Sequence, residues 1–323
     1  MTSAVRFGAG YARMRALKGL LWGVGDRAML IQSGLDPRGR AISGAPDQIF
    51  PPLLRWYVTL IAAYPSARGI FLALVRFHEI ENVKLLWRAA LRRRPLPLEC
   101  WRPLDPLSTV PPAFRSSSVE ELGERLASTP FRDIAHALLR SSPGDLPATE
   151  IGLDRWAVRA LHAEALRLPP REHAARDLLV DVCRERDVDL LRRGSSSYGL
   201  DPDLVAKSTI VLSLEHAIGP LAALATWRPD MGPLASFLPP RLLRLAGPVR
   251  DWDALAIALR HRRLRACRRA FIGWPFELSP PVSALLLREE QARVAISAAA
   301  ARPLPNPAGT ALNTVLAASA LES

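Results

Sequence analysis

The sequence predicts an all-α fold, and three observations support it. Apolar residues recur with helical periodicity through nearly all of the 323-residue chain. Alternating β-branched runs bounded by hairpin dipeptides are almost absent. The 29 prolines gather between the helical stretches, where they indicate stiff connections. With 49% hydrophobic residues the chain can bury a core, so a folded protein of many helices is expected.

No signal sequence or membrane span is expected. Residues 1–21 mix arginines into every turn and lack a continuous apolar core followed by a small-residue cleavage site. The longest apolar stretches are 56–75, which is interrupted by Pro65, Arg68 and Gly69, and 209–227, which carries Glu215 and His216. Both are interpreted as core helices of a soluble chain.

The stretch "FHEIENVKLLWRAALRRR", residues 77–94, predicts an amphipathic helix. One arc of this helix is apolar, and Glu79 lies within that arc. A carboxylate in such a position needs a partner because burying an unpaired charge is unfavourable. The opposite stripe, which we expect to face water, consists of Glu81, Lys84, Arg88 and Arg92.

The next helix start is marked at residue 118. Ser118 precedes "VEELGERLA", and Glu121 follows three residues later. This spacing predicts a capping box, in which each of the two side chains accepts a hydrogen bond from the backbone of the other residue.

An internal repeat with a shift of 100 residues organises the chain. "LLRW" at 53–56 matches "LDRW" at 153–156, and "LRR" at 91–93 matches "LRR" at 191–193 without a gap. A fainter third copy, at 251–271 and 273–301, repeats an arginine-rich helix, a proline-containing turn and a long amphipathic helix. Three related helical units predict a pseudo-symmetric body.

The sequence offers little support for catalysis, cofactors or metals. Cys100, Cys183 and Cys267 lie far apart with no ligand spacing, so neither a disulfide framework nor a zinc site is expected. "GSSSYG" at 194–199 is no nucleophile elbow and is interpreted as a flexible loop, and "FGAG" at 7–10 follows no strand. His78 adjoins Glu79, but neighbouring residues on a helix do not share a face, so we expect a packing role.

The net charge of +12 favours acidic partners, which include nucleic acid, an anionic membrane and an acidic protein. The densest basic run, "RHRRLRACRR" at 260–269, could contact phosphates, although no nucleic-acid-binding motif accompanies it. A solvated helix or an acidic protein partner is the favoured interpretation. A basic helical nucleic-acid-binding protein stays the alternative, and a helical enzyme with an unrecognised site is a third hypothesis.

Five motifs follow one another between residues 10 and 300: "GYARMRALKGLL", "HEIENVKLLWR", "SVEELGERLASTPFRDI", "RRGSSSYGLDPD" and "LLLREEQARVAIS". Their order and spacing resemble the C-type central-stalk subunit of the archaeal and bacterial A/V-type rotary ATPases, in the family that includes the d-type subunit of the eukaryotic V-ATPase. The departures are Phe131 in place of a tyrosine and the missing later acid and asparagine of the last motif. The residues that match the family, as structural or interface positions, are Arg13, Arg15, Lys18, Glu79, Asn82, Lys84, Arg88, Tyr198, Arg288 and Glu289.

The resemblance implies three similar helical subdomains in a pseudo-threefold funnel, at approximately 1–115, 116–225 and 226–323. It implies a non-catalytic central-stalk rotor subunit of an ion-translocating complex, without cofactor or metal. The expected partners are the proteolipid ring and the D- and F-type subunits of the central shaft, on the cytoplasmic, inner face of the cell membrane. Glu79 is expected to pair with a basic group of a neighbouring helix, with Arg13 and Arg15 as candidates.

Overall fold

The fold is built from helices alone in the part of the chain that can be described. The computed structural model describes residues 11–12, 21, 45–141, 144–199, 208–212, 252–274 and 276–301. These residues are 78% helical and include no strand, so the predicted all-α class is confirmed. The α-helices are α3 (Pro46–Ala63), α4 (Arg68–Arg92), α5 (Val119–Leu126), α6 (Arg132–Ser141), α7 (Leu146–Leu166), α8 (His173–Arg192), α13 (Trp252–Phe271) and α14 (Ser279–Ala301).

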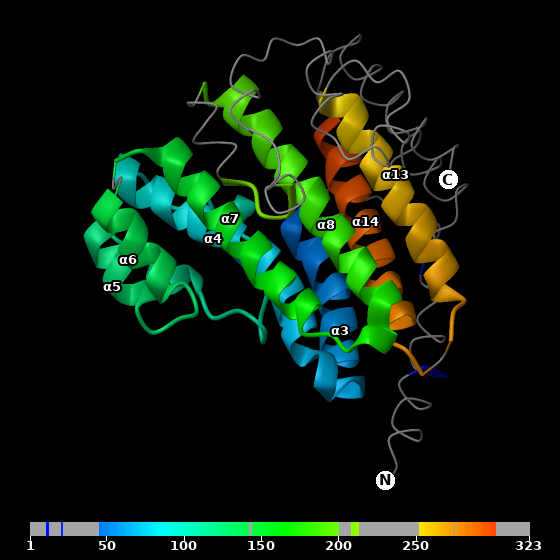
Figure 1. The fold of residues 1–323 in the computed structure, drawn as a ribbon. Helices are drawn as coiled ribbons and strands as arrows, with labels where there is room; N and C mark the ends of the chain where they lie inside the picture. Colours follow the sequence, from blue (N-terminus) through cyan, green and yellow to red (C-terminus); the bar gives the residue numbers. More distant parts are fainter. Residues whose placement is uncertain are drawn as a thin grey trace.

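The six longest of these helices pack in a closed order. Contacts run from α3 to α4, then to α7, α8, α13 and α14, and α14 returns to α3. Figure 1 shows the six as roughly upright rods, with the short α5 and α6 standing beside α4 and α7. The two helices of each pair turn back on one another, by 115° between α3 and α4, and the turns that join α3 to α4, α7 to α8 and α13 to α14 all lie at the lower end (Figure 1).

The helix bounds agree with the 100-residue register of the sequence. α3 begins at Pro46 and α7 at Leu146, while α4 ends at Arg92 and α8 at Arg192. Both pairs are joined by a turn that includes a 3₁₀ segment, Pro65–Ala67 in the first and Pro170–Glu172 in the second. α13 and α14 form a third helix pair with a comparable turn.

The sequence predicted that the prolines lie between the helices, but several of them lie within helices. Pro51 and Pro52 lie inside α3, and Pro46 is in its first turn. Proline is tolerated in the first turn because the N–H groups there have no intrahelical acceptor. α7 and α14 likewise carry prolines in their first turns.

The capping box at α5 is only half formed. The Ser118 hydroxyl accepts a hydrogen bond from the Glu121 N–H at 3.2 Å, as predicted. The Glu121 carboxylate accepts from the N–H and the hydroxyl of Ser117 instead of the Ser118 N–H, each at 2.9 Å. The Ser118 half of the predicted capping box is therefore formed, while the Glu121 carboxylate binds Ser117 instead of the Ser118 N–H.

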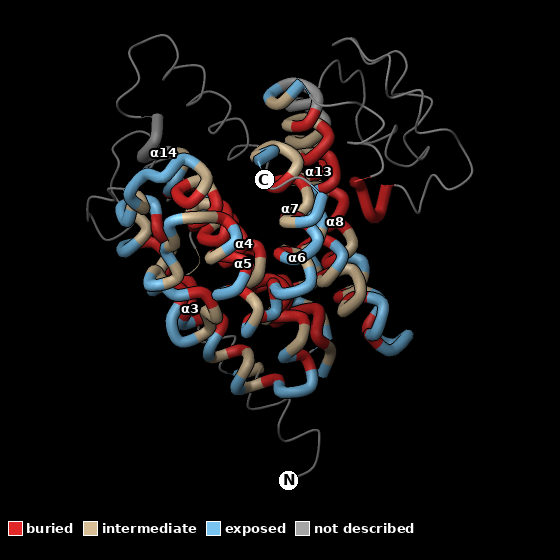
Figure 2. The backbone as a smooth tube through the Cα atoms, turned by 90° about the vertical axis from the view of Figure 1, so that its left-hand side faces the viewer, coloured by how far each residue is buried: buried red, intermediate tan, exposed pale blue. Residues whose placement is uncertain are grey.

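The hydrophobic core lies between the helices, and Figure 2 shows buried positions along the inward faces of the six rods. Its largest fully buried side chains include Trp56, Trp87, Tyr57 and Phe71 from α3 and α4. Burying a side chain of this kind contributes roughly 1.5–3 kcal/mol.

Among the described residues, no single helix has the length and apolar content needed to cross a bilayer. α3 and the stretch Pro65–Arg92 meet that test only jointly, with a 115° bend between them.

Candidate functional site

Glu79 is fully buried on α4, as predicted, and its carboxylate holds the loop that follows the helix. It accepts hydrogen bonds from the backbone N–H of Thr109, from the Thr109 hydroxyl at 2.8 Å and from the Ser108 hydroxyl at 3.2 Å. Its basic partner is Arg76, one turn earlier on α4. The expectation of a partner is confirmed, but the basic group comes from the same helix. Arg13 and Arg15, the candidates named above, lie outside the described residues, as does Lys18.

Asn82 holds the same loop from one turn further along α4. Its side-chain N–H donates to the Arg102 carbonyl at 2.9 Å, and its side-chain oxygen accepts from the Arg102 N–H, also at 2.9 Å. Because Asn82 is fully buried, both backbone groups of Arg102 depend on it for hydrogen bonding. The acid and the amide together fix residues 102–109 against α4.

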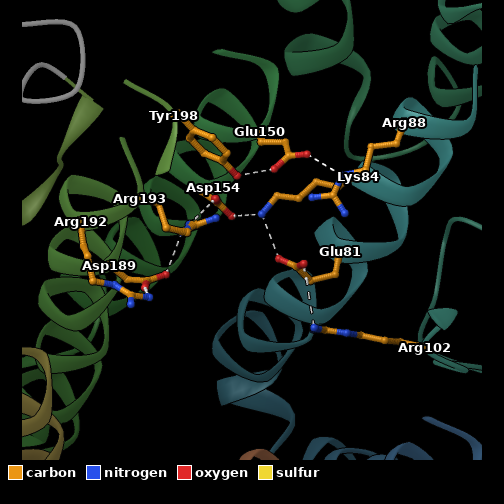
Figure 3. A network of polar contacts seen from close by, with 10 residues as sticks. All are labelled: Glu81, Lys84, Arg88, Arg102, Glu150, Asp154, Asp189, Arg192, Arg193 and Tyr198. Carbon is orange, nitrogen blue, oxygen red and sulfur yellow. Dashed lines mark hydrogen bonds and ion pairs between the residues drawn. The ribbon is translucent and has the colours of Figure 1, made fainter. Parts of the chain in front are cut away.

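The stripe of α4 predicted to face water instead faces α7, and this corrects the interpretation of Lys84. The Lys84 side chain is only 2% exposed. Its ammonium binds Asp154 of α7 at 2.6 Å and Glu81 at 2.9 Å (Figure 3). The wrong expectation arose because periodicity alone cannot distinguish a polar face that meets water from one that meets another polar helix. Arg92 is exposed, as expected.

Arg88 and Tyr198 meet at a second carboxylate of α7. The Arg88 guanidinium and the Tyr198 hydroxyl each donate to Glu150 at 2.6 Å (Figure 3). Burial opposes ionisation of Glu150, but these two hydrogen bonds outweigh it and lower its pKa. Burial and Glu150 raise the pKa of Tyr198 to about 12, so the phenol stays protonated and donates.

The segment that carries Tyr198 is ordered in a way that the sequence did not predict. Residues Arg193–Ser197 form a π-helical turn that continues α8, where a flexible loop was expected. Arg193, at the start of this turn, binds Asp154 at 2.7 Å and Asp189 at 3.1 Å. Asp154 is thus shared between Lys84 of α4 and Arg193 (Figure 3). Ion pairing across α4, α7 and α8 explains why this turn adopts a defined conformation.

A second polar network joins α8, α13 and α14. Arg263 of α13 is buried and binds Glu185 of α8 at 2.6 Å and 3.1 Å, through two nitrogens. Arg260 binds Glu290 of α14, and Arg262 approaches Asp181 of α8 at 3.7 Å. Three arginines of the basic run 260–269 are therefore directed at carboxylates of the same chain. Arg265 and Arg269 are exposed.

An acid followed three residues later by a base recurs on the second helix of each pair. The pairs are Glu81 with Lys84, Asp181 with Arg184, and Glu290 with Arg293. In the first two pairs, Glu81 and Asp181 each lie eleven residues before the last residue of the helix, Arg92 and Arg192. Each of the three acids also meets an arginine from outside its own helix: Arg102, Arg262 or Arg260.

A hollow of about 680 Å³ lies between α3, α4, α8, α13 and α14. Six arginines and five carboxylates line it, together with His78 and several apolar side chains. A neighbouring polar hollow of about 250 Å³ shares Arg102, Arg186 and Arg192 with it and reaches Asp154 and Arg193. Among the described residues, no carboxylate is within ion-pair distance of the exposed Arg186, whose guanidinium lies 4.9 Å from the Phe77 ring centre.

Glu289 lines this hollow and joins the first and last described helices. Its carboxylate accepts from the hydroxyl of Tyr57 on α3 and lies 3.2 Å from Nε2 of His78 on α4. Burial opposes ionisation of Glu289, but His78 and Tyr57 outweigh it and lower its pKa. Burial lowers the pKa of His78 despite the carboxylate. The packing role predicted for His78 holds in part, because its ring also stacks edge-on with Phe50 at 5.3 Å.

The other predicted residue of α14, Arg288, takes no part in these networks. It donates to Gln291 of the same helix at 2.8 Å, and burial together with nearby Arg55 lowers its pKa to about 10. The structure thus brings Lys84, Arg88 and Tyr198 together at α7, places Glu79 and Asn82 on the loop, and puts Glu289 in the hollow. Sequence reasoning missed the acidic partners Glu150, Asp154, Glu185 and Glu290. Of these four, only Glu290 carried a sequence signal, namely the spacing of three between an acid and a following base that it shares with Glu81 and Asp181.

The arrangement of these side chains is better suited to holding helices together and to binding a partner than to catalysis. Within the described ranges, no group of three or more His, Cys, Asp or Glu side chains is arranged to hold a metal ion. Several buried charged groups, among them Lys84, Glu150 and Arg263, form ion pairs that tie one helix to the next, which gives them a structural role. Comparison with known protein families finds no match for this chain, and comparison with curated proteins finds none either.

Proposed function

We propose that the chain is a non-catalytic central-stalk subunit of an A/V-type rotary ATPase, of the C and d type. In this role it couples the rotating shaft of the catalytic head to the proteolipid ring, for proton or sodium transport, at the inner face of the cell membrane. The proposal starts from the resemblance of the five sequence motifs. One structural observation supports it most, namely the closed order of three helix pairs around a charged hollow.

Three related pairs around one hollow agree with a pseudo-threefold funnel. The acid and base repeated on α4, α8 and α14 give these three helices a common pattern, and each of the acids also meets an arginine from outside its own helix. Torque transfer requires a stiff body, and buried ion pairs with fixed partners resist sliding of one helix past another. On this proposal the networks of Lys84 and Arg263 act as braces between the pairs.

The hollow suits the end of a protein shaft better than a small apolar ligand. The hollow is lined by both arginines and carboxylates. Among the described residues, Arg186 has no carboxylate within ion-pair distance, so it can bind an acidic group of a partner. The alternative of nucleic-acid binding loses support because Arg260, Arg262 and Arg263 are directed at carboxylates of the chain itself. Phosphate contacts would need those arginines to leave buried or half-buried partners, which is unfavourable.

The test is recovery of the tagged chain from detergent-solubilised membranes of its own cells, with mass spectrometry and a nuclease-treated control. We expect proteolipid and shaft subunits in the eluate, and we expect their amount to be insensitive to nuclease. Recovery of nucleic acid that is lost at a few hundred millimolar salt, without those subunits, would instead support the nucleic-acid alternative.

A charge reversal distinguishes the hollow from the rest of the surface. Arg186→Glu should lower the recovery of shaft subunits about tenfold, because a like charge then faces the acidic partner. Arg159→Glu on the exposed face of α7 changes the net charge equally and lies outside the hollow, so it is the matched control. Equal losses in the two variants would contradict a shaft site in the hollow.

A further inference from the structure

One end of the helix bundle combines exposed apolar and basic side chains. The turns that join α3 to α4, α7 to α8 and α13 to α14 all lie there, at the lower end in Figure 1. The turn after α13 is tied to the turn after α7, because the Leu278 N–H donates to the buried carboxylate of Glu172 at 2.7 Å. We call this surface the turn face, and define it by the segments 64–68, 166–173, 271–274 and 276–278.

The turn face holds most of the large apolar side chains that the described part of the chain leaves exposed. Seven large apolar residues are exposed in the described part of the chain, and four of them lie on this face: Leu166, Ile272, Trp274 and Phe276. Trp274 is 64% exposed and Ile272 71% exposed, although both lie next to a well-packed core. Trp274 and Phe276 contact each other edge to face at 6.0 Å, so they project as one aromatic pair. An exposed cluster of this kind indicates a binding surface.

The charge of the same surface is positive. Arg68, Arg167, Arg171 and Arg269 are exposed at or beside the three turns. The acids in these segments are largely engaged within the chain: Glu172 is buried under the Leu278 N–H, and Glu277 accepts from the Ser279 hydroxyl at 3.3 Å. Glu164, one turn earlier, is paired with Arg167. The four exposed arginines outnumber the three acids Glu164, Glu172 and Glu277, so the face carries a net positive charge.

We propose that the turn face binds the surface of an anionic lipid bilayer. Tryptophan and phenylalanine place their rings at the boundary between headgroups and acyl chains, and isoleucine and leucine add apolar area there. Arginines close to such a surface are attracted by anionic headgroups. Two features of the face, an aromatic pair at the tip of a turn and a surround of arginines, fit this single occupant. The inference rests on the turn face alone and is independent of the rotor function.

The test is flotation of the purified full-length chain with vesicles of phosphatidylcholine alone and with vesicles containing about 30% phosphatidylglycerol. We expect binding to the anionic vesicles only, and weaker binding as salt rises. The double variant Trp274→Ser, Phe276→Ser should bind at least about tenfold more weakly. Arg167→Glu with Arg269→Glu should weaken binding by at least about 25-fold, because each lost arginine contributes about fivefold near an anionic surface and each new glutamate is repelled by it.

A matched control separates the turn face from the general positive charge of the protein. Arg92→Glu with Arg94→Glu lowers the net charge by the same amount, and both arginines are exposed at the end of α4 that lies away from the turns. We expect this variant, and Leu98→Ser at another exposed apolar position, to bind like the wild type. Equal loss of binding in both arginine double variants would overturn the proposal, as would equal binding to neutral and anionic vesicles.

Self-association is the competing occupant of an apolar face. Sedimentation equilibrium of the chain without lipid should give a monomer whose mass is unchanged by Trp274→Ser. A dimer that this variant dissociates would assign the turn face to a second copy of the chain and would overturn the lipid proposal.

Discussion

Asn82 and Arg102 exchange two hydrogen bonds, each of 2.9 Å, between an asparagine side chain on α4 and the backbone of the loop that follows it. This arrangement imitates a pair of bonds between neighbouring strands inside an otherwise helical protein. It shows how the chain orders the part of a proline-rich connection that lies between two short 3₁₀ segments, Leu98–Cys100 and Pro112–Phe114.

Replacing Asn82 should therefore destabilise the protein beyond the loss of a contact. Asn82→Leu leaves both the N–H and the carbonyl of Arg102 without their partner, and we expect the free energy of unfolding to fall by about 2–4 kcal/mol. Asn82→Asp keeps the acceptor but places a buried carboxylate oxygen against the Arg102 carbonyl, so its effect should be at least as large. Urea denaturation followed by circular dichroism measures both. Equal stability of wild type and Asn82→Leu would show that water satisfies the loop backbone.

Glu79 allows a test of the buried carboxylate. In Glu79→Leu, the Thr109 N–H and Arg76 lose their acceptor, so we expect a loss of about 2–4 kcal/mol in the free energy of unfolding. Glu124→Leu is the matched control, because Glu124 is exposed on α5, and its effect should stay within about 0.5 kcal/mol. A Glu79→Leu protein as stable as the wild type would mean that packing, rather than the carboxylate, fixes the loop.

The ion pairs of Lys84 make part of the stability dependent on pH. Burial opposes ionisation of Glu81, but Lys84 and Arg102 outweigh it and lower its pKa to about 2. Because the folded-state pKa lies below that of the unfolded chain, the contribution is complete above the ordinary glutamate pKa and is lost as pH falls from there towards 2. Since the Glu81 side chain is 35% exposed, solvent screening reduces this contribution to about 1–2 kcal/mol.

Lys84→Met tests that contribution. Without the ammonium, Asp154 and Glu81 lose a buried partner, and we expect a loss of about 2–4 kcal/mol at neutral pH. The fall in the melting temperature between about pH 5 and pH 2 should also become shallower than in the wild type. Arg125→Met is the control, because Arg125 pairs with Glu121 at an exposed position and should contribute little. Identical pH profiles for Lys84→Met and wild type would contradict the assignment to Glu81.

The three cysteines should differ sharply in reactivity. Cys100 is exposed, whereas Cys183 and Cys267 are fully buried. Burial raises the pKa of the Cys183 thiol and raises the pKa of Cys267 to about 12, so neither forms a thiolate at neutral pH. Titration with a chromogenic disulfide reagent should label one thiol in the native chain and three after unfolding. Cys100→Ser should abolish the native signal, and fast labelling that persists in this variant would contradict the described packing.

Helical periodicity was sufficient to predict the helical class and the burial of Glu79, and the 100-residue repeat predicted the register of α3 with α7. They could not predict partners, because the acceptors of Lys84 and Arg88 lie 70 and 62 residues away on α7. A wheel diagram assigns every polar stripe to water unless a polar stripe on another helix is known to face it. The π-helical turn at Arg193–Ser197 was missed for a similar reason, since it depends on ion pairs with Asp154 and Asp189.

The closed order of helices also determines when the helix bundle can be completed during translation. The Tyr57 hydroxyl donates to Glu289, which is 232 residues later in the chain. At about 5–20 residues per second, α14 leaves the ribosome roughly 12–46 s after α3, and until then the face of α3 that it covers stays open. The first helix pair must therefore wait for the last one, so a truncated or stalled chain exposes an apolar seam that chaperones and proteases can recognise.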